Sequence, residues 1–114
     1  MNIAQFVFFD SSSEEQISKP FGNVNQGSAL TIQVDGIDSS SVSVNLSVEG
    51  AADLKMPENY FPLKLVSLET FKTVSSITKT GLYMCVIDGV GLIRIKNNAS
   101  ESLGKFKAYA VSIS

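Results

Sequence analysis

The segment ALTIQVDGIDSSSVSVNLSVEG, residues 29–50, decides the fold of this chain. Apolar residues occupy every second position in both halves of the segment, with Thr, Gln, Ser and Asn between them. Such a period of two is typical of a strand that buries one face. Asp35-Gly36 and Asp38-Ser39-Ser40 supply turn residues, so residues 29–35 and 41–49 are predicted to pair as antiparallel strands. The expected inward positions are Leu30, Ile32, Val34, Val42, Val44, Leu46 and Val48.

The same short strands continue through the rest of the chain. Turn signals such as Thr80-Gly81, Asp88-Gly89 and Asn97-Asn98 separate them, and no segment shows a sustained helical period. The pattern predicts an all-β fold, an antiparallel β-sandwich that is jelly-roll-like, with about eight short strands. The window 50–59 is interpreted as a loop. The further strands are expected at residues 4–9, 61–68, 71–77, 82–87, 91–96 and 105–113.

Length and charge bound the class of protein. With 114 residues, of which 44% are hydrophobic and 18% charged, the chain is expected to form one core without disulfides or metal. A net charge of −2 gives no field for a phosphate backbone, so nucleic acid is not an expected partner. No apolar run is long enough to span a membrane, and the first nine residues lack the basic start of a signal peptide.

The N-terminal segment, residues 1–28, differs from the sandwich domain expected over residues 29–114. The apolar run Phe6-Val7-Phe8-Phe9 is too hydrophobic to stay in water, and polar residues with Gly and Pro follow it. Two alternatives are open: an edge strand of the same domain, or an arm that adds to the sheet edge of another subunit. In the second case these four residues form an assembly site, and residues 29–114 fold without them.

Residues with catalytic chemistry are scarce. The chain has no histidine, so the usual general base and the commonest metal ligand are absent, and we expect neither an enzyme nor a cofactor. The single cysteine, Cys85, lies within a predicted strand with no cation beside it, and is expected to be buried and inert. Asp35 and Asp38 could offer oxygens to Ca²⁺, but a hairpin turn explains them without a metal.

Aromatic residues are interpreted as core rather than as a sugar-binding row, because they fall within or beside predicted strands. These residues are Tyr60, Phe61, Tyr83, Phe106 and Tyr109.

The second half of the chain resembles a widespread group of small bacteriophage virion β-proteins. The motifs that carry the resemblance are NYFPL at 59–63, LET at 68–70, SITKTGLY at 76–83, and DG at 88–89 followed by LIRI at 92–95. The match covers roughly residues 28–113, and Tyr60-Phe61 stand where such sequences often carry Trp. The resemblance implies a structural protein of the capsid-decoration or the head or tail accessory type.

This resemblance leads to a set of functional expectations. The first is a decoration (cement) protein that stabilises the outer shell by bridging capsomers, with the major capsid protein as partner and homo-oligomers as the expected form. Such a protein would be made in the host cytoplasm and reside in the virion. The alternatives are a tail, neck or head-fibre component and, from another class, a carbohydrate- or host-receptor-binding β-module.

Overall fold

The computed structural model describes residues 3–10, 16–22, 29–36, 44–52, 59–87, 90–99 and 106–113. In these ranges the chain forms ten β-strands and no helix. The strands are β1 (Ile3–Phe9), β2 (Phe21–Gly22), β3 (Ala29–Asp35), β4 (Leu46–Ala51), β5 (Phe61–Pro62), β6 (Leu65–Ser67), β7 (Thr73–Val74), β8 (Gly81–Val86), β9 (Leu92–Asn97) and β10 (Lys107–Ile113).

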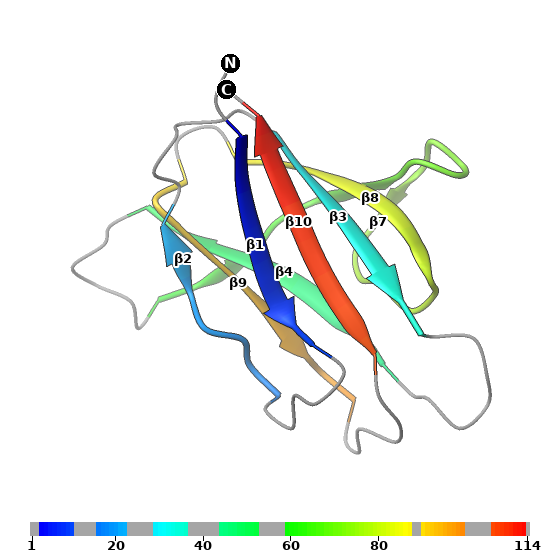
Figure 1. Ribbon diagram of the computed structural model, residues 1–114, viewed down its shortest axis with the longest axis horizontal. Helices are drawn as coiled ribbons and strands as arrows, with labels where there is room; N and C mark the ends of the chain where they lie inside the picture. Colours follow the sequence, from blue (N-terminus) through cyan, green and yellow to red (C-terminus); the bar gives the residue numbers. More distant parts are fainter. Residues whose placement is uncertain are drawn as a thin grey trace.

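The strands form two antiparallel sheets that pack face to face as a sandwich. Sheet A has six strands in the order β1-β10-β3-β8-β6-β7, and sheet B has four in the order β2-β9-β4-β5. Sheet A lies in front in Figure 1, with β9 and β4 of sheet B behind it. The all-β sandwich predicted from the sequence is therefore confirmed.

The pairing of the strands is nested. The first strand pairs with the last, β2 pairs with β9, β3 with β8, and β4 with β5. The jelly-roll-like arrangement expected from the sequence stays a prediction. The hairpin β6–β7 adds two strands at one edge of sheet A, and it brings the number of described strands to ten where about eight were expected.

The predicted pairing of residues 29–35 with 41–49 is wrong. β3 lies in sheet A between β10 and β8, whereas β4 lies in sheet B between β9 and β5. Alternation shows which side of a strand is buried. It does not show whether two such strands pair within one sheet or face each other across the core. After β3 the chain turns at Gly36, whose φ of 94° favours glycine, and Asp38-Ser39-Ser40 lies outside the described residues.

The strands predicted at 61–68 and 71–77 are both shorter in the structure. β5 pairs with β4 in sheet B, while β6 pairs with β8 in sheet A, so the chain crosses between the sheets at Leu63 and Lys64. Only β7 remains of the second strand, and Ile77 forms an isolated bridge with Leu46 of sheet B. One continuous strand could not join both sheets.

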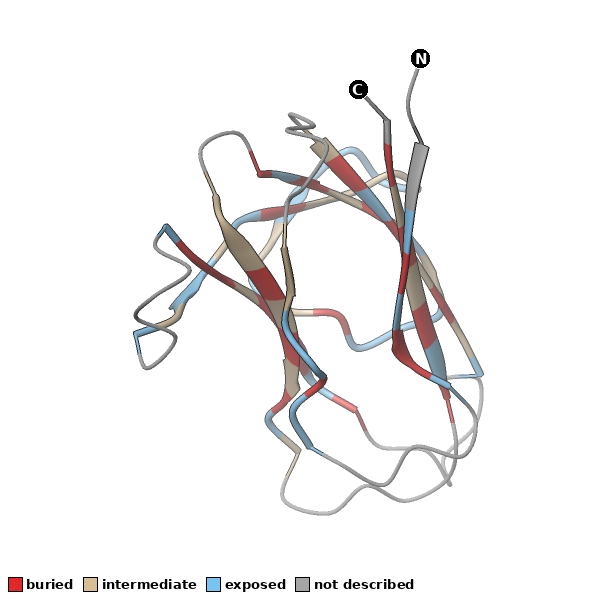
Figure 2. Ribbon diagram, turned by 60° about the vertical axis from the view of Figure 1, so that its left-hand side comes forward, coloured by how far each residue is buried: buried red, intermediate tan, exposed pale blue. Residues whose placement is uncertain are grey.

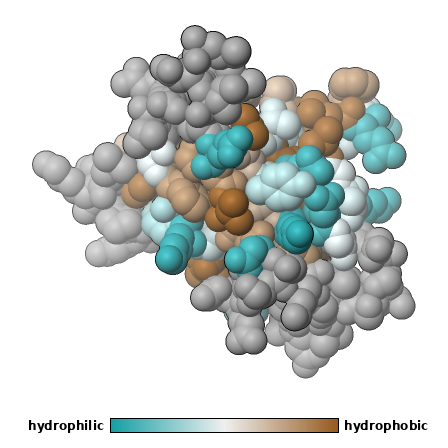
Figure 3. All heavy atoms as spheres, in the orientation of Figure 1, coloured by the Kyte–Doolittle hydropathy of each residue, from teal (hydrophilic) through white to brown (hydrophobic). Residues whose placement is uncertain are grey.

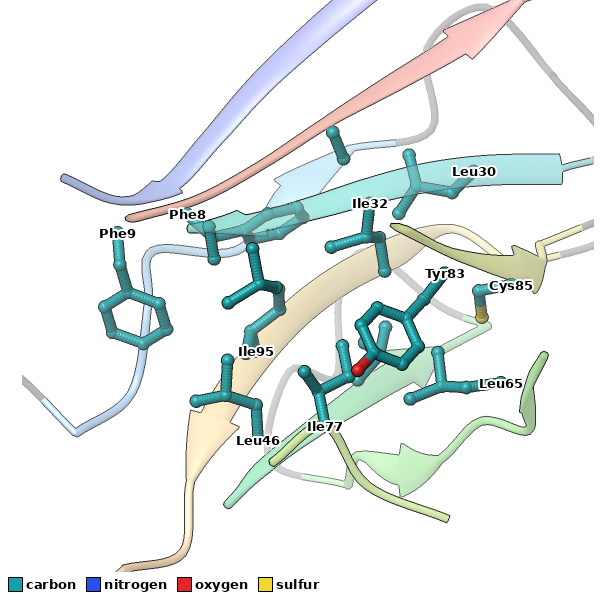
Figure 4. Close-up of a cluster of buried hydrophobic side chains, with 14 of the residues drawn as sticks. Phe8, Phe9, Leu30, Ile32, Leu46, Leu65, Ile77, Tyr83, Cys85 and Ile95 are labelled. Carbon is teal, nitrogen blue, oxygen red and sulfur yellow. The ribbon is translucent and has the colours of Figure 1, made fainter. Parts of the chain in front are cut away.

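The core lies between the two sheets, where buried residues line the facing surfaces (Figure 2). Every described position expected to point inward along residues 29–50 is buried. Phe9, Leu30, Ile32, Leu46, Leu65, Ile77 and Ile95 are each almost fully buried and meet in one cluster (Figure 4). Small residues of β10 accommodate the rings of β1, since Ala110 and Ala108 are the register partners of Phe6 and Phe9.

The N-terminal segment packs within its own domain. β1 pairs with β10 at the edge of sheet A, and Phe21 of β2 carries the same packing to sheet B. The ring centroids of Phe6 and Phe8 lie 5.3 and 5.2 Å from that of Phe21, and Phe9 lies 5.2 Å from Phe106. In this structure β1 is an edge strand of its own sheet, and the division of the chain at residue 28 stays a prediction.

This packing predicts that β1 stabilises the isolated domain. We expect Phe8→Ala to lower the free energy of unfolding by about 3–5 kcal/mol, because the buried ring leaves a cavity. Val7→Ala, at the exposed neighbouring position, is the matched control and should cost less than about 1 kcal/mol. Urea denaturation measures both values. A folded and equally stable protein lacking residues 1–28 would contradict this account.

Candidate functional site

The outer face of sheet B carries polar side chains, several of which are paired with one another. Arg94 Nε donates a hydrogen bond to Glu49 Oε1 over 2.8 Å, and the Arg94 guanidinium lies 3.8 Å from the centre of the Tyr60 ring. Asn98 donates to the hydroxyl of Ser47 over 2.6 Å. A face of paired charges and amides is well solvated, so it has little to gain from being covered.

The outer face of sheet A is different, because its six strands carry only two charged residues, Lys107 and Asp35. These two residues are register partners at one end of the sheet. Between that end and the other, the described outward side chains are aliphatic, aromatic or neutral polar. Figure 3 shows hydrophobic side chains over the middle of this face, with hydrophilic ones around and between them.

Three aliphatic side chains on this face are exposed. Val86 is 64% exposed, Val7 59% and Leu82 44%. The register places Val7, Tyr109, Gln33 and Leu82 in one row across four strands. Interfaces between proteins are depleted of charge at their centre, and the outer face of sheet A has that composition.

A hydrogen-bonded group borders the apolar part of the face. The hydroxyl of Tyr109 donates to Asp35 Oδ2 over 2.7 Å, and Gln33 Nε2 donates to the same oxygen over 3.2 Å. The hydrogen bond to Asp35 raises the pKa of Tyr109 above its usual value, since the neutral phenol is the donor. This contact fixes the Tyr109 ring over the sheet.

A hollow opens on each side of the sandwich, where the edges of the two sheets meet. The first has a volume of about 460 Å³ and lies between β1 and the segment that leads into β2. Its lining is Val7, Phe8, Asp10, Ile17, Ser18, Lys19 and Phe21. The second has a volume of about 480 Å³ and is lined by Pro62, Leu63, Lys64, Thr73, Val74 and Ser75.

The segment beside the first hollow is fixed to sheet B by Ser18. The Ser18 amide donates to the Ile95 carbonyl, and the Ile95 amide donates back to Ser18 Oγ, both over 2.9 Å. The side chain thus continues the ladder of β9 beyond the two residues of β2. Ile17, one residue earlier, remains 42% exposed at the rim.

Phe71 stands out at the opposite end of sheet A. It lies in the turn between β6 and β7, is 79% exposed, and has a φ of 58°. Bulky residues rarely adopt this left-handed conformation, which costs roughly 1–2 kcal/mol when a Cβ is present. Two hydrogen bonds hold the turn, from the Phe71 amide to the Ser67 carbonyl (2.7 Å) and from the Ser67 amide to the Lys72 carbonyl (2.9 Å).

The four assembly residues predicted from the sequence differ in their exposure. Phe6, Phe8 and Phe9 are buried in the core of their own domain, while Val7 is exposed on the outer face of sheet A and lines the first hollow. Only Val7 of the four is therefore available to a neighbour in this structure. An assembly role for the segment stays a prediction.

The aromatic residues follow the core interpretation only in part. Tyr83 and Phe106 are buried as expected, Tyr60 and Tyr109 are half-buried, and Phe61 is 67% exposed at β5. β5 has only two residues, so the sequence contains no alternating pattern there that would predict which side of the strand Phe61 occupies. The exposure of Phe71 was not predicted from the sequence either, since nothing in the local pattern indicates a turn with a left-handed residue.

Within the described ranges, no group of three or more His, Cys, Asp or Glu residues could hold a metal ion. No helix among the described residues is long and apolar enough to cross a membrane. Asp38, considered with Asp35 as an oxygen donor for Ca²⁺, lies outside the described residues.

Comparisons with known proteins give two solved structures with the same fold. The crystal structure of SPBc2 prophage-derived protein YomS is similar with a TM-score of 0.80 and 18% identity, over 99% of this chain and 94% of that one. The crystal structure of PBSX exported protein XepA is similar with a TM-score of 0.78 and 16% identity, over 99% of this chain but 38% of that one. No family model and no curated protein matches the sequence. The fold thus accounts for nearly all of one neighbour and for part of a longer one.

Cys85 is expected to be unreactive in the folded protein. It is buried on β8, and burial raises the pKa of its thiol from 9.0 to about 11. At pH 8 roughly one molecule in a thousand then carries the reactive thiolate. A thiol reagent should label the native protein far more slowly than the urea-unfolded chain, and rapid native labelling would contradict the burial.

The same pKa shift gives a pH dependence of stability. Because the thiol pKa is raised in the folded protein, ionisation of Cys85 favours the unfolded chain. The protein therefore keeps its full stability in this respect below about pH 9 and loses part of it as the pH rises toward 11. Cys85→Ser should fold with a modest loss of stability and should lose this part of the dependence. Urea denaturation of both proteins across that pH range measures the difference.

Phe71→Gly is expected to fold with unchanged or higher stability. Glycine relieves the left-handed strain, worth roughly 1 kcal/mol, whereas the exposed ring contributes little packing. Phe71→Ala is the matched control, because it removes the ring but keeps the Cβ. Thermal unfolding should therefore place the Gly variant above the Ala variant, and the reverse order would contradict the strained geometry.

Proposed function

We propose that this chain is a structural protein of a bacteriophage particle, and that its role is capsid decoration. The resemblance of its second half to small virion β-proteins supports this proposal. So does the prophage origin of YomS, which shares the fold. The proposed partner is the major capsid protein, with neither nucleic acid nor membrane involved. The protein would be made in the host cytoplasm and reside in the virion.

The outer face of sheet A is the observation on which the role depends. Six strands of two to seven residues, at about 3.4 Å per residue and about 4.8 Å apart, give a plane of roughly 500 Å² before side-chain relief is counted. One side of a standard protein interface covers about 800 Å², so the face has about two-thirds of the area of such a contact. Its two charges lie at one end, and Val86 lies on the part free of charge.

The proposed mechanism is purely associative. The apolar face of sheet A would lie against the shell, and the paired charges of sheet B would remain in water. This arrangement requires no catalytic group, and we infer that the protein is not an enzyme. A tail, neck or head-fibre component could use the same face on a different partner.

One observation favours a second class of function. Phe61 exposes 67% of its surface beside Pro62 and Leu63, which line the second hollow. An exposed ring next to a hollow can stack on a sugar, as in a carbohydrate- or host-receptor-binding module. XepA, which shares the fold, is named as an exported protein.

Purified particles test the proposed function. We expect mass spectrometry to find the protein in stoichiometric amounts on virions, and Val86→Glu to reduce its occupancy, because a carboxylate would be buried without a partner. Ser47→Glu is the matched control, since it places the same charge on the outer face of sheet B, opposite Lys96.

Two results would contradict the proposal. The first is absence from purified particles. The second is equal occupancy of Val86→Glu and the wild type, which would exclude the outer face of sheet A. Sugar-dependent binding by the isolated protein, lost in Phe61→Ser, would instead support the receptor-binding module.

A further inference from the structure

We propose that copies of this chain associate head to tail, with Phe71 of one copy inserted into the hollow between β1 and β2 of the next. The contact is built from the two ends of one sandwich and does not depend on the proposed role in a phage particle. It assigns a use to the strained turn and to the first hollow, neither of which the outer face of sheet A requires.

The first observation is the presentation of Phe71. Its ring is 79% exposed and its backbone is left-handed, although a small or polar residue would make the same turn with less strain. Ser67 Oγ accepts a further hydrogen bond from the Thr70 amide over 3.4 Å, so the turn is fixed by its own groups. Strain retained at an exposed position suggests a use for the ring, and a phenyl group gains most by entering an apolar pocket.

The second observation is the hollow between β1 and β2. Val7, Phe8, Ile17 and Phe21 give it an apolar lining, and its volume of about 460 Å³ can admit a phenyl ring. Val7 and Ile17 are exposed by 59% and 42%, so an inserted ring would cover apolar surface that now faces water.

Charges around the two parts are complementary. Glu69 and Lys72 flank Phe71 in the turn, and Asp10 and Lys19 line the hollow. Asp10 already has a partner within its own chain, so the pair expected between copies is Glu69 of one with Lys19 of the next. Such pairs at the rim of a contact fix its orientation more than its affinity.

The topology places the two parts at opposite ends of the molecule. β1 forms one edge of sheet A and β7 the other, and β2 lies on the β1 side while Phe71 belongs to the hairpin at the far side (Figure 1). Because the ring and the hollow lie at opposite edges of one sandwich, two copies cannot make both contacts with each other at the same time. Each copy offers one ring and one hollow, so association continues until a ring of subunits closes or a filament grows.

Sedimentation velocity of the purified chain, across micromolar to millimolar concentrations, tests the proposal. The wild type should form species larger than a dimer. Phe71→Gly should remain monomeric with its fold intact, and its association should be at least about thirtyfold weaker, the loss expected for a central aromatic contact. Ile17→Glu, which places a carboxylate in the hollow, should show the same loss with an unchanged circular dichroism spectrum.

A mixture of the two variants separates this contact from others. Phe71→Gly keeps the hollow and Ile17→Glu keeps the ring, so together they should form a one-to-one dimer and nothing larger. Phe61→Ser is the matched control, because it removes another exposed phenyl ring elsewhere, and its association should equal that of the wild type.

Three outcomes would overturn the proposal. One is a monomeric wild type at millimolar concentration. Another is the persistence of oligomers in Phe71→Gly. If Val86→Glu disrupts those oligomers, the copies associate through the outer face of sheet A instead. The last is a mixture of variants that stays monomeric although each variant is folded. Failure of decoration with association intact would affect only the proposed function.

Discussion

The pairing of the first strand with the last is the constraint on which the rest of this structure depends. β1 and β10 are antiparallel neighbours from Ile3–Ile113 to Phe9–Ala108, so sheet A is complete only when both ends of the chain are in place. The rings of β1 then reach Phe21 of β2 and link the two sheets on their open side. β2·β9, β3·β8 and β4·β5 nest inside this outer pair. A fold whose pairings are so distant in sequence must close long loops before it gains contacts, and such folds form slowly.

The two sheets share one core but meet water differently. On sheet B, the outward charge of Arg94 is paired with Glu49 and with the ring of Tyr60. On sheet A, the outward charges are confined to one end of β10 and β3, and the rest of the face is neutral. An ordinary solvated surface needs no such division. The asymmetry is the physical reason for placing a docking face on sheet A and for leaving sheet B in water.

The edges of the sandwich show how the fold limits uncontrolled pairing. β2, β5 and β7 have two residues each, too few to act as templates for another strand. β1 is the long edge strand, and its register shifts between Val7 and Phe9, which interrupts a regular ladder. The association that we propose, with a ring from the β6–β7 turn in the hollow beside β1, would use side chains and would avoid an open-ended backbone pairing.

The sequence by itself determined the fold class, the buried side of its strands and the burial of Cys85, because a strand's two faces alternate residue by residue and this period is visible locally. The sequence also shows that the strands of sheet A carry few charged residues. Charged residues can be counted in each predicted strand before the strands are assigned to sheets. Which strands are neighbours was decided only in three dimensions: β3 and β4 have the same alternation but belong to opposite sheets. The hollow and the exposed Phe71 likewise exist only once the edges of the two sheets meet, since they depend on side chains brought together from distant segments and on one left-handed residue that no periodicity encodes.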